Sequence, residues 1–139
     1  MQRRRNWIFE NMEDREVVIC MIENDQGEVL LQKKTMDYEK GPGVWAFFGG
    51  ETESKDLEKE ILRELEEEVG FKLPVEFLFK MSGEFLLHVF QGKLNDLSKI
   101  SLGEGAGFAF FAKDELEDLK LTKLMRIILD KYFEIKQND

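Results

Sequence analysis

The stretch from Gly49 to Phe71, GGETESKDLEKEILRELEEEVGF, constrains the fold of this chain more than any other. It begins with two glycines, continues through a short polar loop and ends in a helical pattern. Each helical residue advances by about 100°. Four acidic side chains are therefore predicted to share one helix face: Glu60, Glu64, Glu67 and Glu68. The apolar side chains fall on a neighbouring arc, so the helix buries one stripe and carries carboxylates beside it.

Such a carboxylate stripe is unfavourable for stability alone. Like charges three or four residues apart on a helix repel each other by a few tenths of a kcal/mol per pair. Acidic residues near a helix C-terminus also oppose the helix dipole. A hard divalent cation with oxygen ligands would convert this repulsion into binding. The alternative is a solvated acidic face, which is the commoner meaning of a run of charges.

The same stretch resembles the signature of the Nudix hydrolases. The segment from Arg63 to Phe71, RELEEEVGF, matches the second half of that signature at every specified position. The first half departs from it, because Asp56 stands where the family has a glutamate and the loop is one residue shorter. Lys55 replaces the usual loop glycine, and Phe48 replaces the proline that commonly precedes the glycine pair. These departures affect the loop, whereas the intact half supplies the metal ligands in that family.

The resemblance implies a set of metal ligands and catalytic groups. The implied metal ligands are Gly49, through its carbonyl, Glu64, Glu67, Glu68 and Glu104. Glu64 and Glu67 are the candidate catalytic carboxylates, and which glutamate of the set, Glu68 included, is the base is not assigned. Arg63 is expected to orient a carboxylate by a forked ion pair. Glu60 is a weaker candidate on the same face.

Two further residues are implied to bind substrate. Lys34 ends a predicted strand, where the family often places a basic residue near the phosphates, and Trp45 could flank a base or sugar. Their simpler interpretations are solubility at an edge strand for Lys34 and core packing for Trp45. Glu104, in a glycine-rich turn, could equally be an incidental acid. His88, the only histidine, is interpreted as structural, because no nucleophile signature accompanies it.

Length and composition predict a single domain over residues 1–139 with a substantial core. The apolar fraction is 42% and the net charge is −9, which argues against a nucleic-acid polymer as partner. No apolar run approaches the length of a membrane span, and the amino terminus lacks a secretory signal. The single cysteine, Cys20, suits a reducing compartment, so we expect a cytoplasmic protein.

Alternating and β-branched patterns predict strands over residues 16–22, 28–34, 44–48, 75–81, 84–92 and 108–112. Helices are predicted up to Val69, from Lys113 and over residues 119–135, with Ser54 and Thr122 as candidate caps. Strands interleaved with helices in this order indicate the α/β class. From the resemblance we expect an α/β/α sandwich of the Nudix type, in which a mixed sheet lies between helices.

The function that follows is metal-dependent hydrolysis of a diphosphate linkage in a nucleoside diphosphate derivative, with Mg²⁺ or Mn²⁺ as cofactor. Nucleoside triphosphates, nucleotide sugars, ADP-ribose and dinucleoside polyphosphates all remain open as substrates. The expected partner is a small nucleotide, and a homodimer is a possible assembly. The alternative is a Nudix-fold nucleotide-binding module with weak catalysis, which the altered loop favours; a plain acidic scaffold is a third hypothesis.

Overall fold

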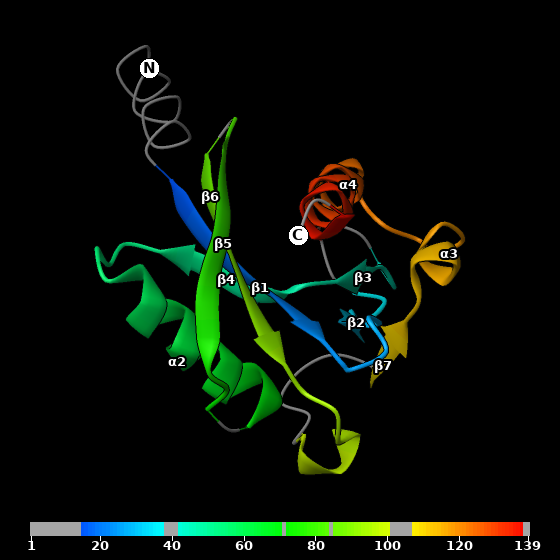
Figure 1. The fold of residues 1–139 in the computed structure, drawn as a ribbon. Coiled ribbons are helices and arrows are strands. Elements are labelled where there is room, and N and C mark those ends of the chain that lie inside the picture. The colour runs from blue at the N-terminus through cyan, green and yellow to red at the C-terminus, as the bar shows by residue number, and fades with distance from the viewer. Residues whose placement is uncertain (1–14, 38–41, 71, 84, 101–106, 138–139) are drawn as a thin grey trace.

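The computed structural model of the chain describes residues 15–37, 42–70, 72–83, 85–100 and 107–137 (Figure 1). Its strands are β1 (Glu16–Glu23), β2 (Val29–Lys33), β3 (Trp45–Ala46), β4 (Phe48–Thr52), β5 (Val75–Ser82), β6 (Leu86–Lys93) and β7 (Gly107–Phe111). Its helices are α2 (Leu57–Val69), α3 (Lys113–Leu116) and α4 (Lys123–Gln137), with a 3-10 turn, η1, at Leu97–Lys99. Among these residues, no helix is long and apolar enough to cross a membrane.

Strand β1 organises a seven-stranded mixed sheet. It runs parallel to β6 along its whole length, and β5 pairs antiparallel with β6. The remaining edge of β1 is shared, since residues 16–20 pair with β4 whereas Ile22 and Glu23 pair with β2. Strand β2 in turn pairs with β3 and β7. Strands β4 and β2 therefore follow one another along the same edge of β1, and the glycine pair lies in β4.

The two faces of the sheet carry separate apolar cores, one under each long helix. On the α2 face, alternate side chains of β1 pack against the apolar stripe of the helix, including Val18, Cys20, Ile61 and Leu65. The other face packs against α4, as Figure 1 shows. Helices on both faces of a mixed sheet confirm the predicted α/β class.

Residues immediately before and after α2 determine where the helix begins and ends. Asp56 is the N-cap, because its carboxylate accepts a hydrogen bond from Lys59 N at 3.1 Å. The expectation that Ser54 caps the helix is therefore wrong: Ser54 Oγ accepts from Asp56 N at 3.1 Å instead. Gly70 ends the helix in the left-handed conformation, as predicted, with its N–H donating to Glu66 O.

The segment predicted as one strand over residues 44–48 is two strands, and the second is longer than expected. The chain passes from β3, which pairs with β2, to β4, which pairs with β1, so Phe47 is a buried link between two partners. Strand β4 then continues through Gly49 and Gly50 to Thr52. Only residues 53–56 remain as a loop, so the glycine pair is held by sheet hydrogen bonds immediately before the helix.

Candidate active site

Glu68 is the α2 carboxylate that is held by hydrogen bonds from the sheet. Its Oε1 accepts a hydrogen bond from Gly49 N at 2.8 Å, and its Oε2 accepts one from Gln32 Nε2 at 2.7 Å. Both contacts cross from the last turn of α2 to the sheet. The short loop before the helix therefore still leaves the Gly49 N–H within hydrogen-bonding distance of the last turn of α2.

Glu64 lies one helical turn earlier, against the second glycine. A Cβ atom added to Gly50 would lie 2.9 Å from Glu64 Oε1 and 3.2 Å from its carboxyl carbon. Only glycine leaves room for the carboxylate to approach the backbone so closely. The side chain of Glu64 is 15% exposed, so this close approach is largely shielded from solvent.

Arg63 gathers three acidic side chains of the helix. Its guanidinium donates to Glu67 Oε1 at 2.7 Å and to Glu64 Oε1 at 3.0 Å, and its Nε donates to Glu60 Oε1 at 3.1 Å. Arg63 thus orients carboxylates along the helix, as the sequence predicts for a forked ion pair. The Glu67 side chain is the most open of the three, at 60% exposure.

Burial and charge act differently on the carboxylates. Burial raises the pKa of Glu68, against the lowering effects of its hydrogen bonds from Gln32 and Gly49 and of the nearby Lys34 charge. Burial also raises the pKa of Glu64, with the Arg63 charge opposing it. The hydrogen bond from Arg63 instead lowers the pKa of Glu60. The two carboxylates nearest the glycine pair therefore carry negative charge at a cost that a bound cation would offset.

The remaining predicted site residues fall in different places. Lys34 follows β2 on the α2 side, where its charge acts on Glu68. Trp45 packs against the α4-side core, with its ring edge-on to Phe111 at a centroid separation of 4.8 Å. Glu104 lies outside the described residues. His88 is buried, with its Nε2 3.6 Å from Glu16 Oε1, which suits the structural interpretation.

Gln32 is the residue that the sequence analysis missed. Its side chain is buried in β2 and donates both to Glu68 Oε2 and to Phe47 O, the latter at 3.2 Å. A signal for it exists, because Gln32 lies two residues after Leu30 and so points to the same face of the sheet. A polar side chain at a buried strand position must have a hydrogen-bonding partner. The carboxylates of the predicted helix were the hydrogen-bond acceptors available to Gln32.

The donor set suits a hard divalent cation, although its members have not converged on one point. Among the described residues, no three acidic, histidine or cysteine side chains stand together as a ready-made ion site. Glu64 and Glu68 nevertheless present oxygen ligands from one helix face toward the glycine pair. Carboxylate and backbone carbonyl oxygens are the ligands that Mg²⁺ and Mn²⁺ prefer.

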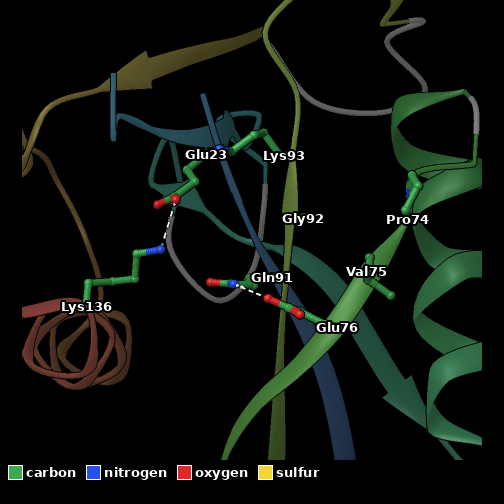
Figure 2. A pocket seen from close by; sticks show the side chains of 8 residues that line it. All are labelled: Glu23, Pro74, Val75, Glu76, Gln91, Gly92, Lys93 and Lys136. Atoms are coloured by element: carbon green, nitrogen blue, oxygen red, sulfur yellow. Dashed lines mark hydrogen bonds and ion pairs between the residues drawn. The ribbon is translucent and has the colours of Figure 1, made fainter. Parts of the chain in front are cut away.

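A polar pocket elsewhere on the molecule is separate from these carboxylates. Figure 2 shows its lining, which comes from β1, β5, β6, α4 and the residues next to them. Lys136 Nζ forms an ion pair with Glu23 Oε1 at 3.1 Å, and Gln91 Nε2 donates a hydrogen bond to Glu76 Oε1 at 2.6 Å. The α2 carboxylates, not this pocket, hold the chemistry that the sequence predicts.

Comparisons with known proteins agree with this geometry. The family model of the NUDIX domain matches residues 13–132. A MutT protein from Methanosarcina mazei is 19% identical, with a TM-score of 0.70 over 86% of this chain and 92% of that one. A MutT NUDIX hydrolase from Burkholderia pseudomallei is 25% identical, with a TM-score of 0.67 over 84% and 96%. The NUDIX domain of Shewanella oneidensis NrtR, solved with ADP-ribose, is 15% identical, with a TM-score of 0.70 over 87% of each chain. A comparison with curated protein sequences gave no match.

The chain belongs to the NUDIX family, since the family model covers most of its length. It is a Nudix hydrolase, and the resemblance seen in residues 63–71 is confirmed. Membership implies hydrolysis of nucleoside diphosphates linked to another moiety, and binding of a small nucleotide. Proteins of this family generally use divalent metals such as Mg²⁺.

Proposed function

We propose that this chain hydrolyses a diphosphate linkage in a nucleoside triphosphate or related nucleotide, with Mg²⁺ or Mn²⁺ held by the carboxylates of α2. The observation that carries the proposal is the contact of Glu64 and Glu68 with the glycine pair. Glu68 Oε1 lies 2.8 Å from Gly49 N, and Glu64 lies in the space that a side chain at Gly50 would fill. Two carboxylates of α2 thus lie against neighbouring glycines of β4.

The ion would be held by Glu64, Glu67 and Glu68, with the Gly49 carbonyl, and Glu104 is proposed as an outer ligand. When bound, a divalent ion neutralises diphosphate oxygens and lowers the pKa of a coordinated water. Glu67 currently faces Arg63, and its exposed carboxylate is free to turn about its side-chain torsions. The ion pair between Arg63 and Glu60 does not depend on Glu67, so it can persist when the Glu67 side chain rotates away from Arg63.

The chain's own residues supply positioning and proton transfer. A carboxylate that is not fully engaged as a ligand takes a proton from the attacking water, and Glu64 and Glu67 are the two candidates. Arg63 keeps both within its reach, because its guanidinium donates to each. Lys34, on the same side as Glu68, is proposed to contact the substrate phosphates as a point charge.

Substrate choice beyond a nucleoside diphosphate derivative depends on residues outside this cluster. Trp45 is proposed as a contact for base or sugar, but its packing against Phe111 favours its role in the core. The structural neighbour with bound ADP-ribose makes that compound one member of the panel to test. Nucleoside triphosphates and nucleotide sugars complete the panel.

The second candidate is a nucleotide-binding module with weak catalysis. It is favoured by the engagement of Glu60, Glu64 and Glu67 with a single arginine, which reduces the charge offered to an ion. The two candidates differ in turnover. A panel of nucleotides incubated with Mg²⁺ or Mn²⁺, with release of phosphate, pyrophosphate or nucleoside monophosphate as readout, distinguishes them. Turnover that Glu67→Gln abolishes supports the hydrolase, and binding without turnover of any member supports the module.

A further inference from the structure

An apolar groove lies between the end of the β5–β6 hairpin and the start of α4, on the face opposite α2. Its apolar lining consists of Met81, Phe85, Leu87, Leu124 and Ile127. Leu124 and Ile127 are 40% and 44% exposed, so α4 presents two large aliphatic side chains to the open side of the groove. Clustered apolar surface of this kind marks a place where something binds.

The chain enters the described fold at the rim of this groove. Arg15 O accepts a hydrogen bond from Leu86 N at 2.8 Å. The Arg15 guanidinium carbon lies 5.7 Å from the centre of the Phe85 ring, and Phe85 is part of the groove lining. Residues 1–14, MQRRRNWIFENMED, therefore join the fold directly beside the apolar surface.

Residues 1–14 contain large apolar side chains, which an apolar groove can bind. The segment contains three consecutive large apolar residues, Trp7, Ile8 and Phe9, followed by Met12. The family model begins at residue 13, so these residues precede the part of the chain that the family shares. Arg15 is eight positions after Trp7, a distance of about 12 Å along a helix and at most about 29 Å along an extended chain. Either length reaches a groove that begins at Phe85.

We propose that the Trp7-Ile8-Phe9 segment of the same chain occupies the groove between the β5–β6 hairpin and α4. Two aromatic rings would cover Leu124 and Ile127, and each ring buries roughly 150–250 Å². A short tether gives an effective concentration of about millimolar, so even a weak contact is occupied within one molecule. Lys123 borders the groove, and the first charged residue after the apolar trio is the acidic Glu10.

A second copy of the chain fits the groove less well. A stable interface between two proteins uses roughly 20–30 residues on each side. The groove has eight lining residues, which suits a peptide segment of a few residues. The proposed occupant is therefore intramolecular and independent of the chemistry at α2.

Tryptophan fluorescence tests the proposal on the full chain. The emission of Trp7 is obtained by subtracting the spectrum of Trp7→Phe from that of the wild type, which leaves out Trp45. We expect Trp7 to emit at short wavelength and to resist quenching by acrylamide. Ile127→Glu should shift its emission to longer wavelength and raise its quenching constant severalfold. Met36→Glu, at a 74% exposed position in the loop after β2, is the matched control and should leave Trp7 unchanged.

A stability cycle and a hydrodynamic measurement complete the test. Phe9→Ser should lower Tm in the wild type but not in the Ile127→Glu background, because the contact is then already lost. Ile127 is exposed, so its replacement leaves the core intact, and far-ultraviolet circular dichroism checks this. Trp7 that is solvent-exposed in the wild type and unaffected by Ile127→Glu would overturn the proposal. So would a sedimenting dimer that Ile127→Glu dissociates, since the second copy would then fill the groove.

Discussion

At the scale of single residues, the four glutamates on one face of α2 have four different environments. Glu60 is held by Arg63, Glu64 is pressed against Gly50, Glu67 is largely exposed and Glu68 is fixed by two donors from the sheet. Helical periodicity predicts that the four glutamates share a face, but it does not distinguish their environments. The differences come from the strands that α2 packs on, so each substitution has its own expected outcome.

Glu67→Gln should affect chemistry and leave stability unchanged. The Glu67 side chain is 60% exposed and forms an ion pair with Arg63, which contributes little at a surface position. We predict an unchanged Tm without metal and a fall in kcat of about 100-fold or more, because a ligand or base is lost. Glu66→Gln, an exposed neighbour on another side of the helix, is the control. If both variants lost hydrolysis equally in a steady-state assay, the assignment of the active face would be wrong.

Glu68→Gln should differ from Glu67→Gln by destabilising the fold. A glutamine at position 68 offers one acceptor and one amide donor, so it cannot accept from both Gly49 N and Gln32 Nε2. We predict a loss of about 1–3 kcal/mol in the free energy of unfolding, measured with urea. Gln32→Met removes the same contact from the other side. The double variant should therefore lose less than the sum of the two, and strict additivity would show that the contact is not formed in solution.

At the scale of elements, the site is the junction of β4 with α2, and a chain of side-chain acceptors replaces the missing loop residue. Thr52 Oγ1 accepts from Ser54 N at 3.0 Å, Ser54 Oγ accepts from Asp56 N, and the Asp56 carboxylate accepts from Lys59 N. Each acceptor satisfies a backbone donor that a tight loop would otherwise leave exposed. The loop can be short because β4 carries the chain to Thr52 before it turns.

The two glycines of β4 should respond differently to a methyl group. At Gly50 the Cβ would meet the end of the Glu64 side chain, which can swing away, so Gly50→Ala should fold with a nearly unchanged Tm. Displacement of Glu64 should reduce hydrolysis by about 10- to 100-fold. At Gly49 the Cβ would lie 2.0 Å from Val18 O, and φ is +142°, so Gly49→Ala should lose about 3 kcal/mol or more of stability.

Gly83→Ala is the control for both glycine substitutions, since an added Cβ there meets nothing within 4 Å. Activity and urea unfolding are measured on all three variants. A Gly50→Ala variant with full activity would show that the position of Glu64 against the strand is not needed for hydrolysis.

At the scale of the whole molecule, the order of elements could be predicted from sequence, whereas the pairing of distant strands could not. Hydrophobic period identifies residues 16–22 and 75–81 as strands, and both are confirmed. Nothing in that period indicates that β1 runs parallel to β6 or divides its other edge between β4 and β2, because pairing is decided by contacts far apart in the chain. For the same reason the structure is needed to identify Glu68 as the partner of Gln32, although the strand pattern already places Gln32 on a buried face.

The whole molecule also determines how a metal effect must be measured. With a net charge of −9, any added salt screens repulsion and can raise stability without a specific site. A ligand that binds only the folded chain adds about 2.7 kcal/mol at 100 times its Kd, or roughly 5–10 °C in Tm. We predict this gain with millimolar Mg²⁺ or Mn²⁺, compared with sodium chloride at equal ionic strength. Glu67→Gln and Glu68→Gln should reduce the gain and Glu66→Gln should retain it, because Glu67 and Glu68 are proposed metal ligands and Glu66 is not. An equal rise in Tm with sodium and magnesium at matched ionic strength would mean that the carboxylates of α2 form a solvated acidic face.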